Sequence, residues 1–187
     1  MEVKGTSPTN TLEFVRQRFG EAGVRRWLDA LSPASRELFE GKILASSWYP
    51  AATAFTEPVG RMCELFFADD AATGAWQLGR FSAENTLTGV YKVFVRIGSP
   101  GFMLERASKV FETFFRPGEV RLIERGRGLA VMRIQGMDEV SELWENRIGG
   151  FIEAAAEIAK APERRVQVVT HGTAAGRIID YRLSWRE

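Results

Sequence analysis

Cysteine and histidine, the residue types that most often act as nucleophile and base, occur once each in this chain, as Cys63 and His171. A thiol beside an imidazole can form a nucleophilic pair, and clusters of Cys and His bind zinc. A single histidine cannot form a multi-histidine zinc site. His171 precedes Gly172 in a segment expected to be a hairpin loop, where a solvated turn residue is the ordinary interpretation. We therefore predict no catalytic site, no metal site and no enzymatic activity.

The single cysteine lies in a segment with helical periodicity. Val59, Met62 and Phe66 recur around Cys63 at the spacing of one buried helix face. This pattern favours a buried, inert thiol. A nucleophile, a redox thiol or an acylation point is the alternative, although Arg61 is the only basic residue close by in sequence. With one cysteine, no intramolecular disulfide can form.

Glycine and arginine concentrate around residues 116–133. The run Gly126-Arg127-Gly128 resembles part of a phosphate loop, but it joins two expected strands and opens no helix, so a hairpin turn explains it better. The arginines of this region are Arg116, Arg121, Arg125, Arg127 and Arg133. Nucleic-acid binding and an ordinary solvated strand face are the two interpretations. The formal net charge of +1 provides no large field for a polyanion, and we predict no nucleic-acid partner.

The composition, 45% hydrophobic and 26% charged, is typical of globular proteins. No window approaches the roughly 18 uninterrupted apolar residues of a membrane span. The opening MEVKGTSPTN lacks the apolar stretch of a secretory signal. We therefore predict a cytoplasmic protein without a membrane partner, and a single domain over residues 1–187.

Helix-start signals dominate the first part of the chain. Asn10 and Glu13 form a candidate capping box for a helix to about Phe19. Ser32-Pro33 and Pro58 mark two further helix starts, because proline is tolerated in the first turn. Residues 71–97, and the segment from Ser99-Pro100 to Phe114, also have helical character. The sequence predicts a flexible segment over residues 1–8 and a helical section over residues 9–117.

The hydrophobic period changes to two in the last third of the chain. Alternating apolar residues predict one hairpin around Gly126–Gly128 and another formed by residues 165–170 and 177–185. Asp138 is the expected cap of a long helix to about Ala161, in which Gly149-Gly150 indicates close packing against the sheet. We predict an α+β fold in which residues 118–187 form a ββαββ section. Its four-stranded, mainly antiparallel sheet carries the long helix on one face and shares a core with the helical section.

Several features lie between Trp76 and Glu187: Gly79-Arg80, Ser99-Pro100, Gly150 and the closing Tyr181-x-Leu183-x-Trp185. On these residues the chain resembles a family of bacterial proteins, abundant in myxobacteria, that is related to heme-NO-binding and 4-vinyl-reductase domains. The resemblance implies an α+β scaffold, an apolar pocket between helices and sheet, and frequent homodimerisation.

The heme-binding relatives hold iron with a histidine on a helix and bind the propionates with a Tyr-x-Ser-x-Arg motif. The expected helices of this chain contain no histidine, and the corresponding region, Gly128–Arg133, reads GLAVMR. The resemblance therefore does not carry heme over, and we predict no cofactor.

A non-enzymatic sensor or adaptor module of a bacterial signalling system is the function that we predict. It would bind a small apolar ligand or a protein partner. A homodimeric scaffold without a ligand is the alternative, and an enzyme related to the vinyl reductases is supported only by the family relationship. We predict that five residues line the ligand pocket: Trp48, Cys63, Phe66, Phe94 and Phe114. The alternative for each of them is that it only fills the hydrophobic core.

Overall fold

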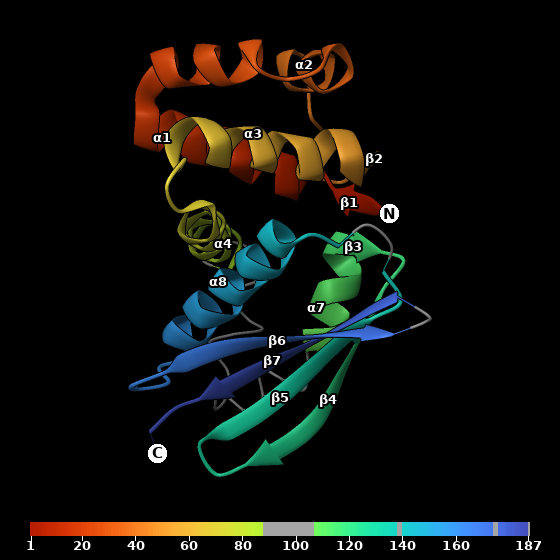
Figure 1. Cartoon of the computed structure of the whole chain (residues 1–187), viewed down its shortest axis with the longest axis vertical. Helices are drawn as coiled ribbons and strands as arrows, with labels where there is room; N and C mark the ends of the chain where they lie inside the picture. The colour runs from red at the N-terminus through yellow and green to blue at the C-terminus, as the bar shows by residue number, and fades with distance from the viewer. Residues whose placement is uncertain (88–106, 138–139, 174–175, 187) are drawn as a thin grey trace.

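The computed structural model describes residues 1–87, 107–137, 140–173 and 176–186. Figure 1 shows the described elements in three levels, with a group of helices at one end, a second group in the middle and a sheet at the other end. The first group contains α1 (Thr6–Asp29), α2 (Pro33–Glu40) and α3 (Glu57–Phe66), with the π-helical turn η1 (Ala52–Thr56) leading into α3. The middle group contains α4 (Ala71–Leu87), α7 (Ala107–Phe114) and α8 (Glu142–Ile158).

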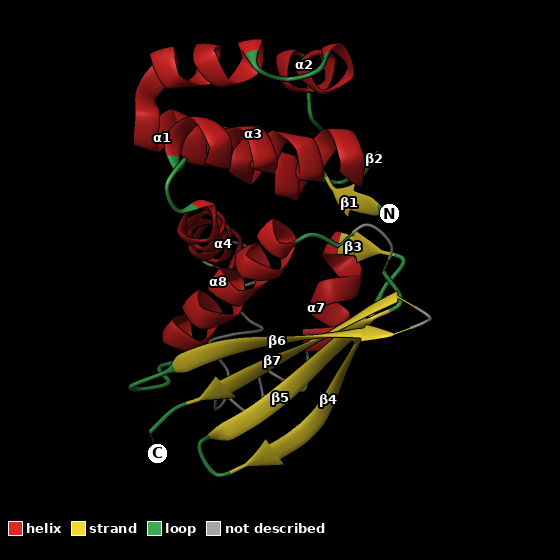
Figure 2. Ribbon diagram, in the orientation of Figure 1, coloured by secondary structure: helices red, strands yellow, loops and turns green. Residues whose placement is uncertain are grey.

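The sheet confirms the two predicted hairpins. It contains β4 (Glu119–Gly126), β5 (Leu129–Gln135), β6 (Arg165–Thr173) and β7 (Gly176–Ser184). The order is β4-β5-β7-β6, and every neighbouring pair is antiparallel. The described helices lie on one side of this sheet (Figure 2). The alternation read from the sequence follows from this one-sided cover, because every second side chain of β7 must enter the core.

The first residues of the chain are ordered, contrary to the expected flexible segment over residues 1–8. A short strand β1 (Glu2–Lys4) lies between β2 (Trp48–Pro50) and β3 (Phe115–Arg116), antiparallel to both. Val3 is fully buried. The N-terminus is therefore held by segments that follow much later in the chain.

The predicted start of the first helix is wrong by about one turn. Helix α1 begins at Thr6, so Asn10 lies inside it and donates a hydrogen bond to Thr86 Oγ1 of α4 (3.2 Å). Gly20, with a φ of 68°, kinks α1 where the sequence predicts a break. The Ser32-Pro33 start is confirmed, and the Ser32 hydroxyl accepts from the Ser35 backbone N–H.

Helix α8 packs against α4 with direct backbone contact. A Cβ atom on Gly150 would lie 2.1 Å from the Trp76 carbonyl oxygen, and one on Gly79 would lie 1.9 Å from the Arg147 carbonyl oxygen. The glycines of α8 therefore face α4, which corrects the expectation that they face the sheet. Ser141 caps α8 through the Trp144 N–H; the expected cap, Asp138, lies outside the described residues.

One hydrophobic cluster joins the helices to the sheet. It contains Val15 and Trp27 of α1 together with Ile179 and Tyr181 of β7. This confirms the shared core. None of the described helices is both long and apolar enough to cross a membrane.

A candidate ligand site at a buried arginine

Arg147 is a charged residue inside the core. It lies on α8 and is 4% exposed. Its Nη2 atom donates to the Ser7 carbonyl oxygen of α1 (3.2 Å) and to Ser82 Oγ of α4 (3.4 Å). Its Cζ atom lies 4.3 Å from the centre of the Phe55 ring, in a cation–π contact. Helix α8 therefore places a guanidinium where α1, α4 and η1 meet.

This guanidinium has no counter-charge among the described residues. Its Nη1 atom has no hydrogen-bond partner there. The titratable group that interacts with it electrostatically is the Cys63 thiol. Burial lowers the pKa of Arg147 to about 9, so the side chain is still a cation at neutral pH. Buried charges in proteins are normally paired, because an unpaired one is costly.

The Cys63 thiol does not balance that charge. It is 1% exposed, and its sulfur lies 3.4 Å from the Ala71 carbonyl oxygen, to which it donates. Burial raises the pKa of Cys63 to about 12, and the positive charge of Arg147 only partly opposes this. The thiol is therefore neutral at physiological pH. Its burial confirms the position predicted from the periodicity of α3.

The first turn of α1 adds further unsatisfied polar groups next to Arg147. Gly5 caps this helix without a side-chain hydrogen bond, and the first turn contains no acidic residue. The hydroxyls of Thr6 and Ser7 are buried and have no partner among the described residues. The N-terminus of a helix carries a partial positive charge, which has the same sign as Arg147. We call the group formed by Ser7, Phe55, Cys63, Ser82 and Arg147 the Arg147 site.

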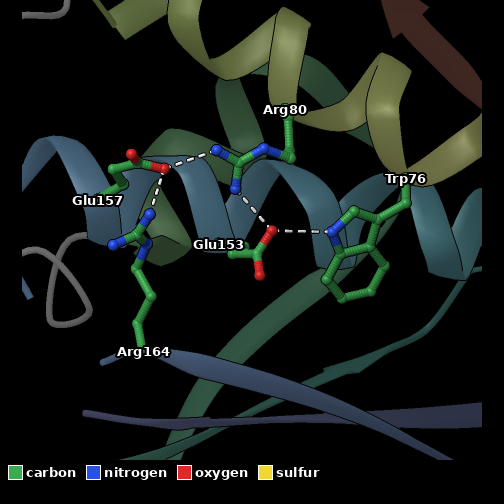
Figure 3. A network of polar contacts seen from close by, with 5 residues as sticks. All are labelled: Trp76, Arg80, Glu153, Glu157 and Arg164. Carbon is green, nitrogen blue, oxygen red and sulfur yellow. Dashed lines mark hydrogen bonds and ion pairs between the residues drawn. The ribbon is translucent and has the colours of Figure 1, made fainter. Parts of the chain in front are cut away.

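A polar network fixes α4 against α8 close to this site (Figure 3). Trp76 Nε1 and Arg80 Nη1 both donate to Glu153 Oε2, at 2.9 and 2.6 Å. Arg80 Nη2 donates to Glu157 (2.6 Å), which also pairs with Arg164. In Figure 3 the Trp76 and Arg80 side chains point from α4 toward α8. The network and the glycine contacts hold together the two helices that carry Ser82 and Arg147.

Cys63 is the predicted pocket residue that belongs to the Arg147 site. Phe66 packs instead on α1, where its ring stacks on Phe19 with centroids 4.0 Å apart. Phe114 of α7 faces Phe151 of α8, with ring centroids 6.4 Å apart.

Trp48 lies in a different part of the protein. It is on β2, where the charged groups of Lys4 and Arg116 lie 4.5 and 4.3 Å from its ring centre. Phe94 lies outside the described residues. The structure therefore does not bring the described members of the predicted set together, and their role as pocket lining stays a prediction.

Sequence reasoning missed Arg147, Phe55, Ser7 and Ser82. One signal was present: Arg147 follows Trp144 by three residues, so it lies beside the apolar stripe of a helix rather than opposite it. A charged residue at such a position is unusual unless it has a specific role. Ser7 and Ser82 carried no signal, because nothing local links the start of α1 to the end of α4.

The remaining polar groups singled out from the sequence are paired. His171 lies within β6 rather than in a loop, which corrects the prediction, and its Nε2 atom lies 3.2 Å from Asp180 Oδ2. Arg133 donates two hydrogen bonds of 2.8 Å to Asp180 and, with the smaller effect of His171, holds the pKa of that carboxyl below its usual value. Arg121 and Arg116 likewise pair with carboxylates. These contacts fit the solvated-face interpretation of the arginine cluster.

A groove lies between α1 and α4. Its volume is about 380 Å³, and it is open to solvent. The groove is lined by Phe14, Gln17, Arg18, Gln77, Arg80, Phe81 and Glu84. Arg80 is already paired with Glu153 and Glu157. The Arg147 site differs from this groove in having a buried charge without a counter-charge.

No protein-family model matches the chain, and no curated protein gives a significant match. Solved structures of H-NOX proteins do match, over 98% of this chain in each case. The Fe(II) unliganded H-NOX protein from K. algicida is 12% identical, with a TM-score of 0.71 over 97% of that chain. The chain has the H-NOX fold. A mutant Cs H-NOX (14% identical, TM-score 0.75, 97% of that chain) and a mutant H-NOX from T. tengcongensis (12%, 0.72, 98%) agree with this.

Other matching structures come from work on heme distortion in the H-NOX family and on the modulation of heme redox potential. The described residues of the present chain do not fit a heme. His171, the one histidine, is on β6 and bound to Asp180. The Cys63 thiol is protonated, and the buried Tyr181 hydroxyl donates to the Glu145 carbonyl oxygen. The Arg147 guanidinium occupies the junction of the helices, so the described part of the chain offers no free imidazole, thiolate or phenolate ligand there.

Proposed function

We propose that this domain is a non-enzymatic sensor module that binds a small molecule, without heme, at the Arg147 site. The shared fold with H-NOX proteins supports a sensor role. One observation carries the location: the buried guanidinium of Arg147 has a nitrogen without a partner in the described part of the chain, at the junction of α1, α4 and α8. An uncompensated buried charge lowers stability. A buried charge that is held on a rigid pair of helices, as Arg147 is, has the features of a ligand-binding group.

Native mass spectrometry of freshly purified protein tests this proposal. We expect a non-covalent mass above that of the polypeptide, retained by wild-type protein and lost in Arg147→Met. The matched control is Arg16→Met, at a half-exposed arginine on the surface of α1 that pairs with Glu13 and Glu21, and it should keep the mass. Absence of a retained mass, together with no rise in the melting temperature when a small-molecule extract of bacterial cells is added, would overturn the proposal.

A separate experiment tests the proposal that the domain does not bind heme. We expect hemin added to the protein to be removed by gel filtration, with no remaining Soret band, because His171 is engaged on the sheet. A Soret band that survives gel filtration and disappears in His171→Ala would overturn this part.

A homodimeric scaffold without a ligand is the alternative. Among the described residues, the exposed large hydrophobic side chains are Leu44 (48%) and Ile123 (45%), which lie on separate segments. They form no contiguous apolar patch of the kind that marks an interface. A dimer whose stability is independent of any small molecule would favour the scaffold.

A further inference from the structure

We infer that the ligand of the Arg147 site is a small monocarboxylate with an apolar remainder, held by the free N–H groups of Arg147. This inference rests on the proposed function and specifies the class of ligand. It follows from the free donors, the charge balance and the polarity of the surrounding side chains.

The Arg147 site has hydrogen-bond donors that could bind an anion. Nη2 donates its two N–H groups to Ser7 O and Ser82 Oγ, whereas the N–H groups of Nη1 have no acceptor among the residues that the structure describes. The Ser7 hydroxyl, two residues after the cap of α1, also lacks a partner among the described residues. A guanidinium and a helix N-terminus both bind oxyanions, and no acidic side chain in the first turn of α1 competes for them.

The charge balance selects a monoanion. Arg147 supplies one positive charge, and the Cys63 thiol is neutral. One carboxylate would neutralise the site. A phosphate dianion would leave an excess negative charge in the core, which is as costly as the unpaired arginine. A buried water molecule would satisfy hydrogen bonds but would leave the charge unbalanced.

The remainder of the ligand must be apolar. Phe55 and Cys63 are each 1% exposed, and Leu78, whose carbonyl oxygen accepts from Ser82, is fully buried. Additional polar groups on the ligand would lose their hydration without gaining partners among these side chains. A short alkyl or aromatic acid meets these conditions.

Isothermal titration of wild-type protein with butyrate and with butyramide tests the inference, because the two probes differ in charge and hardly in shape. The protein is first freed of any retained molecule by unfolding in guanidinium chloride, dialysis and refolding. We expect butyrate to bind at least tenfold more tightly than butyramide, and affinity to rise from acetate to hexanoate. We also expect the molecule extracted from freshly purified protein to ionise as a carboxylic acid.

Variants locate the effect. Arg147→Met should abolish the preference for butyrate, Arg147→Lys should retain part of it, and the control Arg16→Met should retain all of it. Equal binding of butyrate and butyramide would overturn the inference and leave small-molecule binding intact. Tighter binding of inorganic phosphate, a flat acetate-to-hexanoate series, or a butyrate preference that persists in Arg147→Met would each overturn it as well. Wild-type protein that retains no extra mass and binds none of the probes would instead count against the proposed function.

Discussion

Replacing Arg147 by methionine should stabilise the ligand-free protein. The fall in the pKa of Arg147 from 12.5 to about 9 corresponds to roughly 5 kcal/mol of unfavourable free energy for the charged form, at about 1.36 kcal/mol per pKa unit. The substitution removes two hydrogen bonds of about 1 kcal/mol each and a cation–π contact of about 1–2 kcal/mol. Neither acceptor is left unsatisfied, because Ser7 O still accepts from Thr11 and Ser82 Oγ still donates to Leu78. The expected net gain is therefore about 1–2 kcal/mol, which lies within the range found when buried ion pairs are replaced by apolar side chains of similar volume.

Urea denaturation of refolded, ligand-free protein measures this difference, provided that the slope of the transition is unchanged. The matched variant is Arg80→Met, which removes an arginine that is paired with Glu153 and Glu157. We expect that variant to lose about 1 kcal/mol, so the same substitution should have opposite signs at the two positions. A loss of more than about 2 kcal/mol in Arg147→Met would refute the reasoning, because it would mean that the guanidinium is already compensated within the chain.

Three further predictions follow from the packing. Cys63→Ser should be folded but destabilised by about 1–3 kcal/mol. Because the pKa of Cys63 is raised from 9.0 to about 12 in the folded protein, the difference in unfolding free energy between wild type and variant should be fully present below pH 9 and fall by about 1.4 kcal/mol per pH unit above it. Urea titrations between pH 7 and 10.5 measure this difference. Gly79→Ala should lower the unfolding free energy by more than about 2 kcal/mol, because its Cβ would meet the Arg147 carbonyl. Gly126→Ala, with open space around its Cβ, should be nearly neutral. Coinciding thermal melts of the two variants would contradict this prediction. A chain that lacks Tyr181–Glu187 should be insoluble, because it loses the buried Tyr181 and Leu183 and leaves residues 129–132 of β5 and 165–168 of β6 without partners; soluble protein with a cooperative melt would show that the end of β7 is dispensable.

Features encoded by neighbouring residues could be predicted from the sequence. The alternation at Ile179, Tyr181 and Leu183 predicted a strand with one buried face, and all three side chains are at most 1% exposed. Ser32-Pro33 predicted the start of α2. In both cases the signal and its physical cause lie within a few residues of each other.

Features that depend on distant contacts could not be predicted in this way. The start of α1 at Thr6 depends on β1, whose partner strands are β2 and β3. Gly149-Gly150 indicated a close contact but not its partner, which is Trp76 of α4. The candidate site shows the same limit: Cys63 was identified as buried, whereas the acceptors that hold Arg147 come from the beginning of α1 and the end of α4.

The pairing of β1 also constrains how the chain acquires its structure during synthesis. Val3 pairs with Tyr49 on one side and with Phe115 on the other. Until β3 has been synthesised, β1 therefore has one unpaired edge, and the apolar side chain of Val3 lacks part of its packing. Because such distant pairings close late, the N-terminal segment is expected to fold after β3 has emerged. Strand β1 should thus be among the last of the described elements to become protected from proteases in a nascent chain, although it is translated before its partners.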